Sequence, residues 1–263
     1  MTALGRSTVR HILALPDRAD VVELSWHGVT HVGYRRAANE DSYLADVPLF
    51  AVADGMGGHA HGDRASDSVV RRLQAAVDGD FVDPDRIIEA LQRATIDIGE
   101  LDEEERGIGT TVTGAALTLH EGRPVVTVFN VGDSRVYLFT GNELRQVTTD
   151  HSMVQEMVDA GQITAEEAES HPDANVITRA VGFSVDPEID FVRIPLEAGM
   201  RLLLCSDGLT KEVPSERLRL HLAARLSARE TANALVDAAL AQGGRDNITV
   251  VVVDVVRAPS SED

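Results

Sequence analysis

Aspartates stand at the ends of several apolar, strand-like runs of this chain, most of them beside a glycine. The aspartates concerned are Asp54, Asp133, Asp207 and Asp246. A carboxylate at the end of a buried strand loses its water and needs a partner. Several carboxylates gathered at one sheet edge repel one another unless a cation lies between them. The pattern predicts a hard-metal site on a β scaffold, where glycine lets the backbone approach closely.

Length and composition favour a single domain. The chain has 263 residues, 43% of them hydrophobic, with no Pro/Ser-rich linker and no repeat. An ordinary globular core is therefore expected. We predict one domain over residues 21–257, preceded by an N-terminal arm of unknown role (1–20) and followed by an acidic tail (258–263).

The net charge indicates which partners are unfavourable, and the single cysteine indicates the kind of compartment. A formal net charge of -19 argues against nucleic acid and against an anionic membrane surface, since both attract basic proteins. Cys205 cannot form a disulfide within the chain, which fits a reducing compartment. No segment approaches the roughly 20 apolar residues of a membrane span, and no signal-peptide core is present. We expect a cytoplasmic protein, monomeric by default.

Periodicity indicates strands and helices along the whole chain after a weakly patterned start, which could be a short arm or helix. Strands are predicted over 21–31, 49–54, 111–119, 124–131, 135–139, 143–147, 191–194, 201–205 and 248–256. Helices are predicted over 65–77, from Pro84 to about 98, over 153–160, from the capping box Thr164/Glu167, and from the capping box Ser227/Glu230 to Gly243. Strands and helices do not alternate strictly, so an α+β fold is favoured, with an antiparallel sheet pair sandwiched by helices.

The candidate ligands are all oxygen donors. They are Asp54, Asp133, Asp207 and Asp246, with Glu40 in a nearby loop. No Cys/His cluster has zinc-like spacing, so the set favours Mg²⁺ or Mn²⁺. A single Asp-Gly pair is most often only a turn, but several at strand ends favour a metal site. Arg35 and Arg36 precede Glu40, and either could clamp a phosphate beside the metal.

Other hydrolytic nucleophiles are poorly supported. Ser134 has no Gly-x-Ser-x-Gly elbow and no suitably placed histidine and acid. Cys205 lies in an apolar run, with Lys211 where a cysteine phosphatase would carry its loop arginine, so we interpret Cys205 as a core residue. The glycines at 55–58 are not a P-loop, because no Gly-Lys-Ser/Thr follows. Metal-activated water is the remaining nucleophile.

Taken together and in order, the motifs resemble the metal-dependent (PPM, type 2C) protein serine/threonine phosphatases of the bacterial branch. The residues that carry the resemblance run from about 25 to 256. They include Asn39-Glu40-Asp41-Ser42, Asp54-Gly55-Met56-Gly57-Gly58-His59, Gly109-Thr110-Thr111, Asn130-Val131-Gly132-Asp133-Ser134-Arg135, Thr149-Asp150-His151, His171-Pro172, Ser206-Asp207-Gly208-Leu209 and Asp246-Asn247-Ile248-Thr249. The resemblance implies a four-layer αββα sandwich, two antiparallel sheets flanked by helices, with a flap subdomain.

The resemblance also implies two Mg²⁺ or Mn²⁺ ions at one end of the sandwich. By match to the family motif, Asp54 bridges the two ions and Gly55 gives its backbone carbonyl to one of them. Asp207 and Asp246 hold the other ion. Glu40 acts through the water shell of the ion on the Gly55 side.

Further roles follow from the same match. Asp133 with Asp207 corresponds to a weaker third-metal site of bacterial members. Arg36 falls where the phosphate-binding arginine lies, which leaves Arg35 a bystander. Residues 150–182 correspond to a mobile flap beside the active site.

The implied reaction uses Asp54 and Arg36 as its catalytic residues. Two cations lower the pKa of a bridging water, and the resulting hydroxide attacks phosphorus in line while Arg36 offsets the developing charge. Met56 stands where animal-type members place a proposed histidine acid, and His59 and His61 are interpreted as loop residues. Water is then the default proton donor, and His151 stays open between flap packing and phosphate approach.

The leading hypothesis is a phosphatase of phosphoserine and phosphothreonine on proteins, opposing bacterial Ser/Thr kinases. One alternative is a partner-switching phosphatase that resets an anti-sigma-factor antagonist. Another is a catalytically silent binding module that kept the fold, which the complete set of carboxylates disfavours. Arg135 and Asn247 are interpreted as structural hydrogen-bonding residues.

Overall fold

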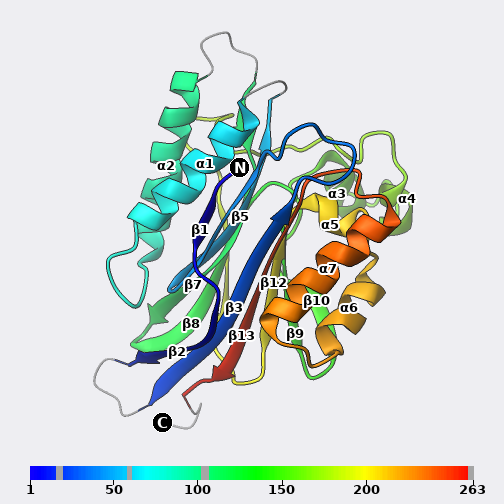
Figure 1. Cartoon of the computed structure of the whole chain (residues 1–263). Coiled ribbons are helices and arrows are strands. Elements are labelled where there is room, and N and C mark those ends of the chain that lie inside the picture. The colour runs from blue at the N-terminus through cyan, green and yellow to red at the C-terminus, as the bar shows by residue number, and fades with distance from the viewer. Residues whose placement is uncertain (16–19, 58–60, 102–106, 260–263) are drawn as a thin grey trace.

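Two β-sheets packed face to face form the centre of the computed structural model, which describes residues 1–15, 20–57, 61–101 and 107–259 (Figure 1). The first sheet has the order β1-β4-β5-β7-β8-β11, with β6 paired to β5. Its strands are β1 (Ala3–Gly5), β4 (Asp41–Asp46), β5 (Leu49–Met56), β6 (Gly109–Thr110), β7 (Val112–His120), β8 (Arg123–Val131) and β11 (Asp190–Pro195). The second sheet has the order β10-β9-β12-β13-β3-β2. Its strands are β2 (Thr8–Ala14), β3 (Val21–His31), β9 (Arg135–Thr140), β10 (Glu143–Gln146), β12 (Arg201–Cys205) and β13 (Ile248–Arg257).

Helices cover the outer face of each sheet and complete four layers. On the first sheet lie α1 (Gly62–Ala75) and α2 (Pro84–Leu101), and on the second lie α6 (Ser215–Ala223) and α7 (Ala228–Gln242) (Figure 1). The remaining helices are α3 (Met153–Asp159), α4 (Ala165–Glu169) and α5 (Asp207–Thr210). Both predicted capping boxes, at Thr164/Glu167 and Ser227/Glu230, are confirmed. No helix in the described ranges is long and apolar enough to cross a membrane.

The continuous apolar runs of the sequence reflect strands that are covered on both faces. Along β13, Val251 and Val253 belong to the core between the sheets, whereas Val250 and Val252 pack under α6 and α7. Successive side chains of a strand point to opposite faces, so a strand covered twice needs apolar residues at every position. The strand ends are the places left for polar chemistry.

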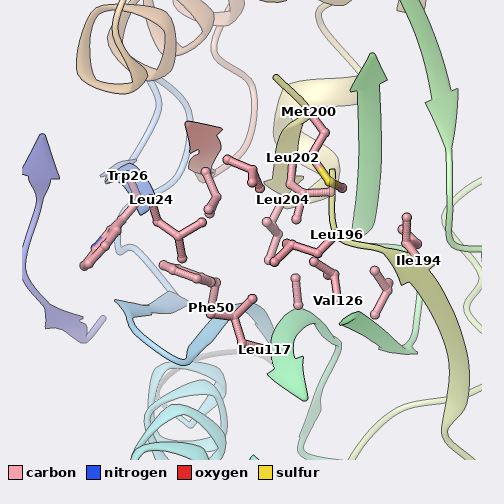
Figure 2. Packing of buried hydrophobic residues seen from close by; sticks show 14 of the residues in the cluster. Leu24, Trp26, Phe50, Leu117, Val126, Ile194, Leu196, Met200, Leu202 and Leu204 are labelled. Atoms are coloured by element: carbon pink, nitrogen blue, oxygen red, sulfur yellow. The ribbon is translucent and has the colours of Figure 1, made fainter. Parts of the chain in front are cut away.

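The core between the sheets is built around large side chains from both of them (Figure 2). Trp26 of β3 meets Phe50 of β5 edge-to-face, with ring centroids 5.5 Å apart. Trp26 is 1% exposed, and its indole N–H donates to the carbonyl oxygens of Arg6 (2.6 Å) and Ala45 (3.0 Å). This side chain ties the second sheet to β4 of the first and satisfies its own polar atom.

The α+β sandwich is confirmed, with corrections at its N-terminal edges. The helix considered for residues 1–20 is wrong for the described part, where β1 and β2 form instead. β2 pairs antiparallel with β3, but β1 pairs in parallel with β4, so the first sheet is not purely antiparallel. Both are edge strands of mixed polarity, which leaves no clear alternation to read. The end of the predicted acidic tail, 260–263, and His59 lie outside the described residues.

Candidate metal centre

All seven residues predicted to form the site line one pocket of about 830 Å³ at an end of the sandwich: Arg36, Glu40, Asp54, Gly55, Asp133, Asp207 and Asp246. They come from segments far apart in sequence. Asp54 lies in β5, Asp207 begins α5 directly after β12, and Asp246 precedes β13. Asp133 lies in the turn between β8 and β9. The loop between β3 and β4 supplies Arg36 and Glu40. The sheets bring their strand ends together, as the aspartate pattern predicts.

Glycines beside the aspartates allow this convergence. A β carbon on Gly208 would lie 1.9 Å from the carbonyl oxygen of Asn247, and one on Gly55 would lie 2.0 Å from that of Gly62. No other residue type fits such contacts without moving backbone. The Asp-Gly pairs therefore serve close packing of neighbouring chain segments around the carboxylates.

The carboxylates of the pocket destabilise one another's ionised forms. The pKa of Asp54 is raised well above its ordinary value by burial and then by the charges of Asp41, Asp207, Asp133 and Asp246. Burial and the charge of Asp207 raise the pKa of Asp133 to about 7. Repulsion of this kind is relieved by a cation.

Asp41 is a member of this group that sequence reasoning left without a role. It faces Asp54 across the β4–β5 ladder and is fully buried. One carboxylate oxygen, Oδ2, accepts hydrogen bonds from Ser206 (2.8 Å) and Thr249 (2.6 Å), while Oδ1 has no partner among the described residues. Burial, offset by these two hydrogen bonds, raises its pKa to about 7. The available signal was its place directly after Glu40, within the motif Asn39-Glu40-Asp41-Ser42, although the strand that begins at Asp41 was not predicted.

Basic side chains hold two of the aspartates. Arg36 binds Asp246 with two N–H groups, at 2.7 Å from Nε and 2.8 Å from Nη2. Lys211 pairs with Oδ2 of Asp207. In this arrangement, no three His, Cys, Asp or Glu side chains of the described ranges form a ready-made metal-binding group.

The donor set nevertheless fits a divalent cation. Oδ1 of Asp207 is buried without a hydrogen-bond partner in the part of the chain described, although a buried carboxylate oxygen is costly when unpaired. Asp54 lies beside it in a cluster of mutually repelling carboxylates. Carboxylate and carbonyl oxygens are the ligands that Mg²⁺ and Mn²⁺ prefer.

The segment predicted to be a flap borders the same pocket. Ser170, His171, Ala174, Asn175 and Ile177 contribute to its lining. The mobility of this segment stays a prediction.

His151 anchors the start of this segment and does not line the pocket. The side chain is 7% exposed, and its Nδ1 accepts a hydrogen bond from the backbone N–H of Gly132 at 3.1 Å. Because Nδ1 accepts, the proton lies on Nε2, which faces Asp190 at 3.2 Å. Of the two roles left open for His151, the structure supports packing of the segment against β8 and β11.

The residues interpreted as structural behave as predicted. Asn247 accepts from the backbone N–H of Glu40 (2.8 Å) and donates to the carbonyl oxygens of Val32 (2.9 Å) and Ala38 (3.0 Å), so it shapes the loop that carries Arg36. Arg135 holds Asp150 through three hydrogen bonds of 2.6–3.0 Å. Cys205 is completely buried, and burial raises the pKa of its thiol to about 12.

Comparison with known proteins gives the family to which this sandwich and its acidic pocket belong. The family model "Protein phosphatase 2C" matches residues 30–242. The chain belongs to the protein phosphatase 2C family.

Individual relatives agree with this assignment. The serine/threonine phosphatase stp of Listeria welshimeri is 37% identical over 216 residues, which cover 79% of this chain and 84% of that protein. The serine/threonine protein phosphatase PstP of Mycobacterium tuberculosis is 42% identical over 230 residues, covering 85% of this chain but 43% of the relative. The catalytic domain of PstP solved in complex with two manganese ions has a TM-score of 0.77 and 37% identity, over 90% of this chain and 99% of that one.

Proposed function

We propose that this chain hydrolyses phosphoserine and phosphothreonine esters on proteins, with divalent metal held by the acidic pocket. The observation that carries the proposal is the convergence of Asp54, Asp207 and Asp246 with Arg36 in one pocket. Family membership supplies the reaction class. The relatives named serine/threonine phosphatases support phosphoproteins as the substrates.

The proposed metal-holding residues divide between two ions. Asp54 would be shared by both, with the carbonyl of Gly55 on one ion and Asp207 and Asp246 on the other. Glu40 would act through water. When bound, the ions supply positive charge at the phosphoryl oxygens and lower the pKa of water. The structure of PstP with two manganese ions supports Mn²⁺ as one metal that such a site accepts.

Arg36 is proposed to orient the phosphoryl group. Its side chain is 50% exposed at the pocket, and only part of its fork of N–H donors is used on Asp246. A planar guanidinium matches two phosphate oxygens at once and offsets the charge that builds up in the transition state. Asn247 holds the loop that carries this arginine, through its hydrogen bonds to Val32, Ala38 and Glu40.

The remaining proposals concern the surroundings of the reaction. Ser170, His171 and Asn175 would contact the protein chain that carries the phosphate, because they line the same pocket as the aspartates. Water is proposed as the proton donor to the leaving hydroxyl. We propose a monomer that opposes Ser/Thr kinases.

Turnover of p-nitrophenyl phosphate and of a phosphothreonine peptide tests the proposal, with Mn²⁺, with Mg²⁺ and with EDTA. We expect turnover with metal and none with EDTA. Asp207→Asn should lose roughly 10³-fold or more, since metal binding supplies several kcal/mol of the barrier reduction and each tenfold is about 1.4 kcal/mol. Asp237→Asn, at an exposed position of α7, is the matched control and should keep full activity. Metal-independent turnover, or a fully active Asp207→Asn, would contradict the proposal.

A further inference from the structure

Lys211 is the only lysine of the chain, and it lies in the wall of the acidic pocket. The sequence has 24 basic residues, and all of the others are arginines. Lys211 follows directly after α5, and its ammonium group pairs with Oδ2 of Asp207 four residues earlier. Its side chain also lines a second pocket of about 490 Å³ on the other side of this wall. The two pockets share Asp133, Asp207, Lys211 and Ala174.

Asp133, Asp207 and Lys211 all lie in the wall that the two pockets share, and Lys211 forms an ion pair with Asp207. The charge of Asp207 raises the pKa of Asp133, and the charge of Lys211 opposes that rise. Burial lowers the pKa of Lys211, but the carboxylates of Asp207 and Asp133 outweigh burial and raise it. The arginines around this wall are bound to other carboxylates: Arg135 to Asp150, Arg36 to Asp246 and Arg245 to Glu212. Among the described residues of the wall, Lys211 is the cation that is bound to a member of the Asp133–Asp207 pair.

The two oxygens of Asp207 have different surroundings. Oδ2 binds Lys211, whereas Oδ1 is buried and has no hydrogen-bond partner within the described residues. One oxygen is thus available to the proposed metal pair while the other stays on the ammonium group. A metal on Oδ1 and Lys211 on Oδ2 do not compete for the same atom.

We propose that the ammonium group of Lys211 takes the position between Asp133 and Asp207 that the family resemblance gives to a weak third ion. The chain then binds two divalent ions and not three. This inference rests on the proposed function, because it presupposes the metal pair. An ammonium group is a compact point charge, unlike the broad guanidinium fork, and so fits between two carboxylates. Because this charge is covalently tethered, it is present at the same local concentration whatever the metal concentration in solution.

Counting Mn²⁺ ions per chain by equilibrium dialysis and isothermal titration calorimetry tests the inference. We expect two ions for the wild type and three for Lys211→Met, which removes the charge at similar volume. The double variant Lys211→Met/Asp133→Asn should return to two. Arg245→Gln is the matched control, since Arg245 is another cation of the pocket lining, bonded to Glu212, and its loss should leave two ions.

The outcomes separate the two proposals. A folded wild type that binds three ions, or Lys211→Met that still binds two, would overturn the role of Lys211 and leave the proposed function intact. A folded wild type that binds none would overturn the proposed function itself.

A measurement on the unaltered chain covers the case in which Lys211→Met does not fold. Labelling with ¹⁵N-lysine gives a single side-chain NMR signal, because there is one lysine. We expect the ammonium signal of Lys211 to remain visible and shifted from that of free lysine after saturation with diamagnetic Mg²⁺. A signal that moves to the position of free lysine and exchanges rapidly with water would show that Lys211 has left the carboxylates, and would overturn the inference.

Discussion

The layer between the two sheets and the pocket at the end of those sheets are built from the same strands but carry opposite chemistry. Phe50 and Val52 of β5 face the apolar layer, and Asp54 stands two residues further along the same strand. In the layer, every buried side chain contributes favourable burial of apolar surface. In the pocket, burial and the charges of neighbouring carboxylates destabilise the ionised form of Asp54 and raise its pKa. The layer accounts for the fold, and the proposed cation would relieve the repulsion in the pocket.

The comparison also explains why the pocket does not unfold the strands that carry it. Asp41 and Asp54 are fixed by a regular ladder between β4 and β5, in which most of the other residues belong to the apolar clusters or pack against them. Repulsion between the two carboxylates is confined to one end of the ladder, at the start of β4 and near the end of β5. Substitutions in the two regions should therefore have separable effects on stability and on activity.

Trp26→Ala gives the largest expected effect on stability. It removes a side chain that is 1% exposed, together with its contact to Phe50, at a distance from the pocket. We expect a loss of about 3–5 kcal/mol of unfolding free energy, from lost burial and the cavity that remains. Turnover per folded molecule should be unchanged. Urea unfolding and the kcat of the folded fraction measure the two quantities.

Val9→Ala is the control for this substitution. Val9 lies on β2 in the same sheet but is 83% exposed, so its truncation should change stability by no more than about 0.5 kcal/mol. If Trp26→Ala lowered kcat of the folded protein sharply, the two regions would not be separable.

Asp41→Asn tests the residue that joins the two regions. The amide oxygen can still accept from Ser206 and Thr249, but the charge facing Asp54 is lost. Outer partners of metal ligands typically contribute 10–100-fold, so we expect kcat/KM to fall by about that factor without loss of stability. Asp46→Asn, at the far end of β4, is the matched control and should be fully active. An unaltered kcat/KM for Asp41→Asn would show that the charge of Asp41 does not contribute to activity and that its role is structural.

Much of the fold and the membership of the pocket could be predicted from the sequence, because both depend on strand patterns. β13 and β12 are continuous apolar runs, and a carboxylate at the end of such a run stands out. The N-terminal strands could not be predicted in this way. β2 is an edge strand whose exposed and half-buried residues carry no regular alternation, and β1 is only three residues long.

The partners of the predicted residues were beyond the reach of sequence reasoning. Arg36 and Asp246 are 210 residues apart, and only the sheet topology brings them to 2.7 Å. Lys211 and Asp207 have the spacing of neighbours on a helix, but the short α5 was not predicted. Pairing of this kind depends on where chain segments meet, which periodicity does not encode.

The smallest expected effect concerns the pH dependence of stability without metal. The raised pKa values of Asp41 and Asp133, both about 7, mean that the folded state holds protons that the unfolded state has released above about pH 4. Stability from these groups is therefore complete at low pH and is lost as the pH rises from about 4 to 7. With EDTA, we expect the melting temperature to fall by several degrees between pH 5 and 7.5, and with Mn²⁺ this fall should shrink. The lowered pKa of buried His27 acts in the opposite sense up to about pH 6.5, but it affects both curves equally. Asp133→Asn should flatten the EDTA curve, and identical slopes with and without Mn²⁺ would show that metal does not relieve the repulsion in the pocket.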